Sequence, residues 1–355
     1  MVALGGEGIG PEVVDATCEL LLAGGVPVKV LTAPHGEAAL KTHGTPVPDE
    51  TKRLCHQADG VLFGAVGGPA SVAVITYLRW QQDAYANVRP IKYYPGAASP
   101  LTNPTGIDLI ILRENSEGLY PGREGDLSDL ARALPDLSDR AGKRLGDFGE
   151  GRFAVKVVSR RGTERIARFA CELARKRKAR GHQGKVTCVT KSNVLRRSDG
   201  YFREIVEQVV QGYPDLAYEH FYVDDAARRL VRFPQSMDVV VTMNLYGDIL
   251  SDVAAEAAGG LGIAPSGCLG DRWAYFESVH GSAPDIAGKG IANPTAAILS
   301  AAMMLEHMGL AAEAECLEQA VARVYRDGKA LTPDQGGKAT TKEFAQAVLA
   351  ALRNG

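Results

Sequence analysis

The chain has 355 residues, more than one hydrophobic core usually serves, so we expect two domains. Its net charge of −2, with 45% hydrophobic and 23% charged residues, excludes a strongly basic protein built to bind nucleic acid or anionic membranes. The six cysteines form no C-x-x-C pair, which argues against a zinc site or a disulfide framework. The sequence shows no signal-peptide pattern and no apolar run approaching the roughly 18 residues of a membrane span. We therefore expect a cytoplasmic protein without nucleic-acid or membrane partners.

Apolar runs bounded by turn residues alternate along the chain with segments of helical periodicity. This alternation predicts an α/β fold, in which helices pack on sheets. The predicted buried strands lie at residues 59–64, 107–112, 153–158, 186–190 and 238–242. The predicted helices lie at residues 163–178, 196–211, 247–258, 293–308, 311–327 and 340–353.

Two segments interrupt this rhythm. Residues 92–104 are rich in Tyr, Pro, Gly and Ser and fit a crossing between domains, whereas the polar residues 123–151 fit either an exposed arm or a loop. Near the start of the chain, Gly6 to Pro11 approaches the dinucleotide fingerprint G-x-G-x-x-G. Pro11 replaces its last glycine and suits the first turn of a helix instead. The usual Rossmann arrangement is therefore rejected.

A pair of aspartates marks the first candidate site. Asp248 and Asp252 stand four residues apart at the start of a helical pattern, so both carboxylates lie on one helix face. Alone, this spacing fits a helix start better than a metal site, because acidic residues are favoured near a helix N-terminus. Asp224 offers a further oxygen donor. Three carboxylates without nearby Cys or His pairs suit a hard cation, Mg²⁺ or Mn²⁺.

Basic and phenolic side chains follow several predicted strands. Arg79, Arg89 and Arg113 are spaced so that they could bind carboxylates through paired hydrogen bonds, although each alone fits a surface ion pair better. Lys191 ends one strand and Tyr120 follows another. Beside a metal, these two residues would form an acid–base pair.

Residues 276–294 contain three glycines and two prolines and predict a long irregular loop. Small residues would let its backbone approach a ligand closely. Loops of this length are uncommon unless they are functional. The loop ends at Asn293, which fits a helix N-cap with Pro294 at the first helical position.

These residues, in this order, resemble the β-decarboxylating dehydrogenases of isopropylmalate, isocitrate, homoisocitrate and tartrate or D-malate. The resemblance covers nearly the whole chain, and its motifs are long: ILRENSEGLY at 111–120, NLYGDILSD at 244–252 and HGSAPDIAGKGIANPTAAI at 280–298. It implies an isocitrate/isopropylmalate dehydrogenase-like fold of two α/β domains with the active site between them. Residues 1–97 and 254–355 would form the cofactor domain, and residues 98–253 the substrate and dimerisation domain.

The resemblance also implies the role of each candidate residue. Members are homodimers or larger homo-oligomers whose subunits share active sites. Asp248 and Asp252 would bind metal from one subunit and Asp224 from the other. Lys191, also from the partner, would manage the proton of the 2-hydroxyl group, and Tyr120 would protonate the enol carbon after CO₂ leaves. The residues implied to bind the malate carboxylates are Arg79, Arg89 and Arg113.

The glycine-rich loop resembles that of family members that use NAD. Asp285 stands where NADP-dependent isocitrate dehydrogenases tend to carry Lys, and Ile286 replaces their phosphate-binding Tyr. A carboxylate at this position accepts hydrogen bonds from ribose and repels a 2′-phosphate. The resemblance implies that the cofactor is lined by Ile9, Asn193 of the partner subunit, Glu277, His280, Gly281, Ser282, Ala283, Asp285, Ile286 and Asn293.

The segment that would contact the C3 substituent of the substrate, residues 67–76, departs from every named member. Ala73 replaces the Ser of isocitrate enzymes, Thr76 the Arg of homoisocitrate enzymes, and Ile75 with Thr76 matches half of the Leu pair of isopropylmalate enzymes. Val72, Val74 and Ile75 would leave a distal carboxylate without a charge partner. We therefore expect a small-molecule substrate with an apolar substituent, 3-isopropylmalate or a related 3-alkylmalate. Across the whole chain, the sequence motifs nevertheless resemble those of homoisocitrate dehydrogenases most.

Two alternatives stay open at this point. The first is a homoisocitrate or isocitrate dehydrogenase. The second is a catalytically silent paralogue that serves as a regulatory subunit, although such a subunit should have lost metal or proton-transfer residues and this chain keeps them all. Glu7, where the family usually has Asp, has no interpretation from sequence.

Overall fold

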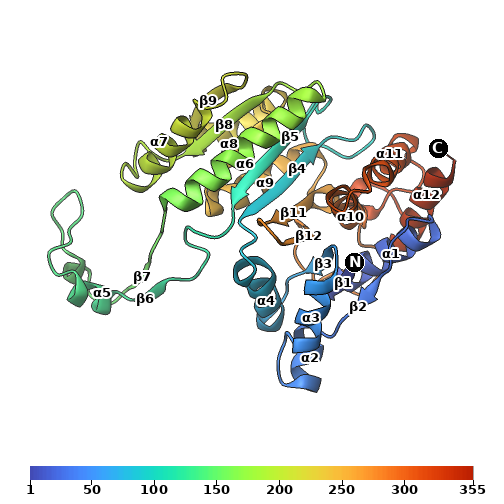
Figure 1. Ribbon diagram of the computed structural model, residues 1–355, viewed down its shortest axis with the longest axis horizontal. Helices are drawn as coiled ribbons and strands as arrows, with labels where there is room; N and C mark the ends of the chain where they lie inside the picture. Colours follow the sequence, from blue (N-terminus) through green and yellow to red (C-terminus); the bar gives the residue numbers. More distant parts are fainter. Residues whose placement is uncertain (355) are drawn as a thin grey trace.

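The computed structural model describes residues 1–354 and is built on one ten-stranded sheet (Figure 1). The strand order is β2-β1-β3-β12-β11-β4-β5-β10-β8-β9. Strand β4 pairs antiparallel with β5 and β11, and β11 pairs antiparallel with β12, while the other neighbours are parallel. The strands are β1 (Val2–Gly6), β2 (Leu31–Thr32), β3 (Val61–Ala65), β4 (Ala86–Lys92), β5 (Asp108–Glu114), β8 (Lys185–Thr190), β9 (Ala217–Tyr222), β10 (Val239–Thr242), β11 (Pro265–Leu269) and β12 (Ala274–Ser278).

Helices cover both parts of this sheet (Figure 1). Helices α1, α10, α11 and α12 pack around the chain-end strands, and α6, α7, α8 and α9 around the central ones. The central strands β8 and β10 are rich in Val and are buried except for Lys185 at the start of β8, as expected for parallel strands covered on both faces. The helices are α1 (Gly10–Ala23), α2 (Gly36–His43), α3 (Asp49–Gln57), α4 (Pro69–Ile75), α6 (Arg160–Ala179), α7 (Ser198–Val210), α8 (Val223–Arg232), α9 (Asn244–Ala258), α10 (Thr295–His307), α11 (Ala311–Asp327) and α12 (Thr341–Arg353).

The two ends of the chain build one half of the sheet and its middle builds the other. Strands β1 to β4 join β11 and β12, whereas β5 joins β8, β9 and β10, and the seam between the halves is the antiparallel β4–β5 pair. The predicted division at residues 98 and 253 remains a prediction about how these halves behave as domains.

An arm projects away from the sheet between β5 and α6 (Figure 1). It contains the short pair β6 (Glu124–Asp126) and β7 (Arg152–Ala154) and helix α5 (Leu127–Ala133), in which no residue is buried. Of the two interpretations of residues 123–151, the arm is therefore correct. The predicted buried strand at 153–158 is wrong: only its first residues are β7, and they pair with β6 in the arm, outside the main sheet.

The other predicted strands and helices are present with ends shifted by a few residues. Helix α10 begins at Thr295, one residue after Pro294, which was expected at its first position. Asn293 still satisfies the helix start, because its Oδ1 accepts a hydrogen bond from the Thr295 amide at 3.0 Å. Within residues 1–354, no helix combines the length and the apolar character that a membrane crossing requires.

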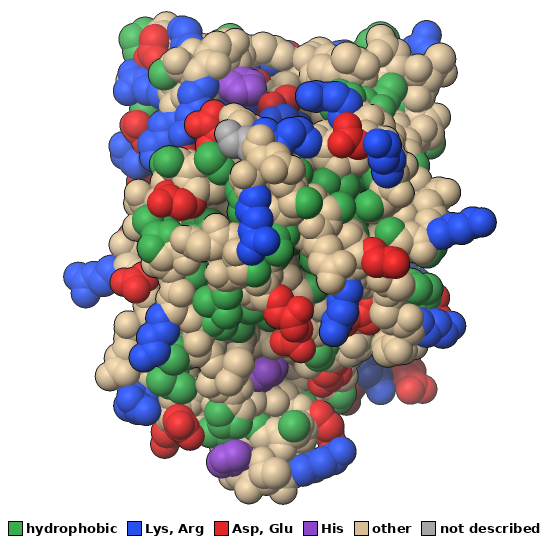
Figure 2. Space-filling view, turned by 90° about the vertical axis from the view of Figure 1, so that its right-hand side faces the viewer, with side chains coloured by type: hydrophobic (Ala, Val, Ile, Leu, Met, Phe, Trp, Pro, Cys, Tyr) green, Lys and Arg blue, Asp and Glu red, His purple; other side chains and the backbone are tan. Residues whose placement is uncertain are grey.

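Figure 2 shows the face formed by the chain-end half of the molecule. Lys and Arg side chains on this face are interspersed with Asp and Glu, and neither sign gathers into a continuous patch. This distribution agrees with the near-zero net charge of the sequence. Such a face creates no strong single-sign field for steering a charged macromolecule.

Candidate active site

The structure brings Asp248 together with two of the three predicted arginines and with Tyr120. Asp248 lies in the second turn of α9, which packs against strands β4 and β5. Its Oδ1 is 3.1 Å from a terminal nitrogen of Arg89 and also contacts Arg113, and its Oδ2 accepts a hydrogen bond from the Tyr120 hydroxyl. Residues separated by more than 100 positions thus meet at one carboxylate, which defines the candidate site.

Arg113 is held at the carboxyl end of β5, an edge where α/β proteins commonly bind ligands. Its side chain is only 1% exposed, and two of its nitrogens donate to Asn244 Oδ1 at 3.0 and 2.7 Å. The absence of a side chain at Gly247 makes this packing feasible, since a Cβ there would lie 2.7 Å from Arg113 Cβ. The motif NLYGDILSD therefore supplies both the space and the partners for a fixed guanidinium group.

Arg89 reaches the same helix from β4. Its Nε donates to Asn87 Oδ1 at 2.8 Å, and a terminal nitrogen donates to Ser251 Oγ at 2.6 Å. The guanidinium group also lies 3.9 Å from Asp252. Arg89 thus lies within 4 Å of both aspartates of the D-x-x-x-D pair.

Arg79 lies apart from Asp248 in a π-helical turn, Thr76–Gln81, that follows α4. Such turns are rare and occur often at functional sites. Arg79 is 8% exposed, and it donates to Tyr275 Oη at 3.0 Å and to Glu277 Oε1 at 2.8 Å. Glu277 was expected beside the cofactor, so this buried ion pair links a predicted substrate residue to a predicted cofactor residue.

The pKa values of Asp248 and Asp252 are shifted in opposite directions. Burial opposes ionisation of Asp248, but Arg113 and Arg89 outweigh it and lower the pKa of this carboxyl. Burial raises the pKa of Asp252, the positive charge of Arg89 opposes that shift, and the negative charge of Asp248 adds to it. A cation placed between the two carboxylates would relieve their repulsion, so this pair fits a divalent metal.

Tyr120 is suited to donate a proton. Burial and its hydrogen bond to Asp248 raise the pKa of the Tyr120 hydroxyl, so it is protonated at neutral pH. The guanidinium carbon of Arg113 lies 4.5 Å from the centre of the Tyr120 ring. This cation packs against the ring and fixes its position beside Asp248.

Lys191 and Asp224 form a second cluster of their own. The Lys191 ammonium lies 2.5 Å from Asp224 Oδ1, and this hydrogen bond lowers the pKa of Asp224. Lys191 follows β8, Asp224 lies in the first turn of α8, and Asn193 is exposed in the loop after Lys191. In residues 1–354 of a single chain, no three Asp, Glu, His or Cys side chains are grouped closely enough to hold a metal ion. The predicted site residues of this chain therefore lie in two separate clusters, one around Asp248 and one around Lys191 and Asp224.

The loop predicted to bind the cofactor lies against the β1–α1 turn. The Ile9 amide donates to the Ser282 carbonyl at 2.9 Å. Gly8 permits this approach: its φ is +62°, and a Cβ there would lie 2.0 Å from the same carbonyl oxygen. The glycine-rich start of the chain thus shapes the cofactor loop without the Rossmann fingerprint.

His280 and Asn293 bracket this loop. Burial lowers the pKa of His280, so its imidazole is neutral at pH 7. Its Nδ1 lies 2.9 Å from the Gly281 carbonyl oxygen, and its Nε2 is buried without a hydrogen-bond partner in the described part of the chain. An unpartnered buried nitrogen fits a missing polar ligand. Ala283 has a φ of +39°, a backbone conformation that is strained for a residue other than glycine. Asp285, two residues later, is exposed.

The segment predicted to contact the C3 substituent needs a correction. Val74 and Ile75 are 0% and 6% exposed and pack into the core beneath α4, so they do not form an open apolar wall. Helical periodicity directs them inward, whereas Val72 is 48% exposed and Thr76, whose hydroxyl donates to the Val72 carbonyl at 2.9 Å, stands beside it. Of this segment, Val72 is exposed and Ala73 and Thr76 are partly exposed.

Glu7 now has an explanation. Its Oε2 accepts a hydrogen bond of 2.5 Å from the Gly68 amide, directly before α4. A Cβ at Gly67 would lie 2.4 Å from the same oxygen, so this glycine provides room for the longer side chain. Glu7 thereby ties the β1–α1 turn to the start of the segment that leads to Arg79.

Comparison with protein-family models decides the family, because residues 1–348 match the model described as isocitrate/isopropylmalate dehydrogenase. The chain belongs to this family. It is a family of oxidatively decarboxylating dehydrogenases, and the family predicted from the motifs is confirmed.

Relatives named for different substrates are almost equally similar in sequence to this chain. A 3-isopropylmalate/3-methylmalate dehydrogenase from Methanocaldococcus jannaschii is 44% identical over 98% of this chain and 97% of its own length. An isocitrate/homoisocitrate dehydrogenase from Thermus thermophilus is 43% identical, with the same coverage of 98% and 97%. The crystal structure of an isocitrate dehydrogenase from Methylococcus capsulatus matches with a TM-score of 0.86 and 38% identity, covering 99% of this chain and 98% of that one. The predicted isocitrate dehydrogenase-like fold is therefore confirmed.

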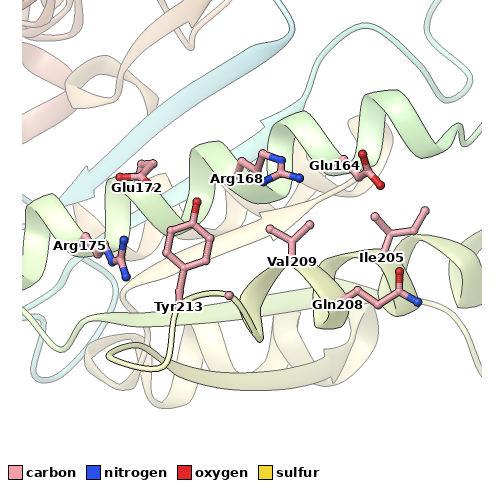
Figure 3. A pocket seen from close by; sticks show the side chains of 9 residues that line it. Glu164, Arg168, Glu172, Arg175, Ile205, Gln208, Val209 and Tyr213 are labelled. Atoms are coloured by element: carbon pink, nitrogen blue, oxygen red, sulfur yellow. The ribbon is translucent and has the colours of Figure 1, made fainter.

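A surface cavity of about 440 Å³ lies elsewhere, between α6 and α7 (Figure 3). In Figure 3, Arg168 and Glu172 project from α6 above Val209 and Tyr213. None of its lining residues belongs to the predicted site of this dehydrogenase. The cavity between α6 and α7 is therefore separate from the candidate site around Asp248.

Several supporting residues were missed by sequence reasoning. Ser251 lies inside a motif that had already been singled out, so its role could have been suspected. Asn87 stands two residues before Arg89 on the same strand, so it could also have been suspected. Tyr275 and Asp199 have no such signal, because Tyr275 meets Arg79 from a distant strand and Asp199 reaches the Lys191 amide from α7. Their roles follow only from the three-dimensional arrangement.

Proposed function

We propose that this protein is an NAD- and divalent-metal-dependent dehydrogenase that oxidises and decarboxylates a 3-substituted (2R)-malate, preferably 3-isopropylmalate or a related 3-alkylmalate. The observation that carries the proposal is the meeting of Arg89, Arg113 and Tyr120 at Asp248. Two guanidinium groups suit a dicarboxylate substrate, a carboxylate pair suits a cation, and a protonated phenol suits carbanion protonation.

When bound, NAD⁺ would accept the hydride from C2, and Mg²⁺ or Mn²⁺ at Asp248 and Asp252 would polarise the C2 oxygen. Arg89 and Arg113 are fixed by Asn87 and Asn244, so they can bind and orient the malate carboxylates with little reorganisation. The side chain of Tyr120 holds the proton that the substrate carbon requires after CO₂ leaves. Arg79, paired with Glu277, completes the set of three arginines.

We further propose that the protein is a homodimer or larger homo-oligomer in which the partner's Lys191 and Asp224 complete each site. Two features support this arrangement. The Lys191–Asp224 pair belongs to no group of three potential ligands in residues 1–354. Large apolar side chains are exposed near both clusters: Ile249 on α9 at 55%, Val231 on α8 at 51% and Val194 after Lys191 at 46%. If these side chains come together in one patch, such a patch would be suited to burial in an assembly.

The preference for an alkyl substituent rests on the segment around α4. Between Val66 and Leu78 there is no Lys, Arg or His to neutralise a distal carboxylate, and the outward-facing Val72 and Thr76 are uncharged. The Methanocaldococcus relative is named for both isopropyl- and methylmalate, which favours the same class. The 43% identity to the Thermus relative favours the second candidate, homoisocitrate or isocitrate.

Steady-state kinetics with purified protein tests the proposal. Reduction of NAD⁺ would be measured with Mn²⁺ or Mg²⁺ and with 3-isopropylmalate, 3-methylmalate, homoisocitrate, isocitrate or D-malate. The expected result is the highest kcat/KM for a 3-alkylmalate and a loss of activity in EDTA that added metal reverses. A preference for homoisocitrate contradicts the alkyl assignment, and no turnover of any of these substrates supports a regulatory paralogue instead.

A further inference from the structure

A buried ion pair lies directly behind Lys191, and the proposed reaction does not use it. Asp199, near the start of α7, has a side chain that is 0% exposed. Its Oδ1 accepts a charged hydrogen bond from the ammonium group of Lys156, which is 19% exposed at the base of the arm. A buried charge is costly unless it is paired, so this pair is a specific feature of the fold.

The second oxygen of Asp199 holds the main chain of Lys191. Asp199 Oδ2 accepts a hydrogen bond from the Lys191 amide at 2.8 Å. The Lys191 carbonyl accepts hydrogen bonds from the amides of Val194 and Leu195, both at 2.9 Å. The backbone of Lys191 is therefore fixed on both sides of its Cα atom, in a loop whose next residues are exposed.

We propose that Asp199, with Lys156 as its counter-ion, is a positioning residue for Lys191. The inference rests on the proposed function, in which Lys191 manages the proton of the substrate hydroxyl. A lysine side chain is long and flexible, so the direction in which its Cα–Cβ bond points decides where the ammonium group can reach. A displacement of about 1 Å in a reacting group can cost about 100-fold in rate.

Lys156 also contacts the other cluster of the same protomer. Its ammonium nitrogen lies 4.8 Å from the centre of the Tyr246 ring, two residues before Asp248 on α9. The same cation is therefore shared between the carboxylate behind Lys191 and the helix that carries the D-x-x-x-D pair. Lys156 thus contacts residues next to both sets of site residues, Asp199 on one side and Tyr246 on the other.

The chain contains a matched control at the opposite end of these strands. Asp238 is 1% exposed and pairs with Arg177, and its Oδ2 accepts hydrogen bonds from the Gly184 and Lys185 amides at 2.7 and 3.2 Å. Like Asp199, it is a buried carboxylate that binds one cation and the main chain beside β8. Unlike Asp199, it touches no predicted site residue.

The experiment compares Asp199→Asn, Lys156→Met, Lys156→Arg and Asp238→Asn in the full-length protein. An asparagine at 199 must turn its amide nitrogen toward either the Lys156 ammonium or the Lys191 amide, so one contact is lost. With rates normalised to NAD-binding sites counted by calorimetry, we expect kcat for 3-isopropylmalate to fall about 30-fold in Asp199→Asn and about 10-fold in Lys156→Met, with KM values within about twofold of wild type. Lys156→Arg keeps the charge and should stay within about threefold of wild-type kcat.

The control separates positioning from general loss of structure. Asp238→Asn should lower Tm at least as much as Asp199→Asn while its kcat stays within about twofold of wild type. If Asp199→Asn and Asp238→Asn change kcat equally, or if Lys156→Arg restores nothing, the positioning role is wrong. Should Asp199→Asn fail to fold, Lys156→Met, which leaves the contact to the Lys191 amide in place, decides between the same outcomes. A wild-type protein without activity on any 3-substituted malate contradicts the proposed function itself, which is a distinct result.

Discussion

Aspartates and arginines lie at both ends of the parallel strands β5, β8 and β10, but their charges are arranged differently at the two ends. At the amino ends, Asp238 and Asp108 both bind Arg177, so opposite charges are paired. At the carboxyl end of β5 and on the adjoining α9, like charges are crowded: the aspartates Asp248 and Asp252 repel, and burial followed by the charges of neighbouring arginines lowers the pKa of Arg113 to about 10.

This difference separates stability from function. Charges that are fully paired in the folded chain stabilise it and have no capacity left for a ligand. Charges that are crowded with others of the same sign are held there by the rest of the fold, and a ligand of opposite charge relieves them. The amino ends of these strands are therefore expected to respond to mutation in Tm, and the carboxyl ends in kcat and ligand affinity.

The largest effect is expected for Asp252→Asn. It removes a proposed metal ligand, so kcat/KM should fall by about 1,000-fold, corresponding to about 4 kcal/mol. The same change removes repulsion with Asp248, so Tm measured without metal should not decrease. Kinetics over a range of Mn²⁺ concentrations and thermal unfolding in EDTA check both parts. A substantial decrease in Tm without metal would break the comparison between the two ends.

The opposite pattern is expected for Asp238→Asn. Loss of the carboxylate leaves the Arg177 cation buried with reduced compensation, and the free energy of unfolding should decrease by about 3 kcal/mol. Denaturant unfolding measures this change, and kcat at a temperature where the variant is folded should match wild type. Arg177→Met is the complementary control, because it strands Asp238 instead of Arg177. A variant with the free energy of unfolding of wild type but a lower kcat would contradict the assignment of this end to stability.

Tyr120→Phe should lower kcat by about 100-fold, because it removes the proton donor together with its hydrogen bond to Asp248. Ring packing on Arg113 is retained, so Tm and the KM for substrate should change little. The distinguishing measurement is product analysis: in the variant, the rate of hydride transfer to NAD⁺ should decrease less than the rate of protonation of the enol product. If NADH formation and appearance of the keto acid slow equally at the first turnover, Tyr120 does not act at the final proton transfer.

Sequence reasoning recovered the central strands and the contiguous motifs, and it failed where a role depends on distant pairing. Val-rich strands such as β8 and β10 can be recognised in the sequence because they are buried on both faces. The half-exposed edge strand β9 was not predicted, since one side faces solvent. Asp199 and Asp238 are both single aspartates in the sequence, and only the fold shows that one meets Lys156 and Lys191 while the other meets Arg177.

The smallest expected effect tests whether the comparison extends to the loop after β12. Asp285 is exposed there, so Asp285→Lys removes no buried contact and should leave Tm unchanged. If this carboxylate faces the adenosine ribose, its replacement by a cation should raise the ratio of kcat/KM for NADP⁺ to that for NAD⁺ by about tenfold, because a favourable contact to a 2′-phosphate replaces a repulsive one. Asp271→Lys, another exposed aspartate between β11 and β12, controls for the change in net charge and should leave the ratio unaltered. An equal response of both variants would show that overall charge, and not a specific contact at 285, sets the cofactor preference.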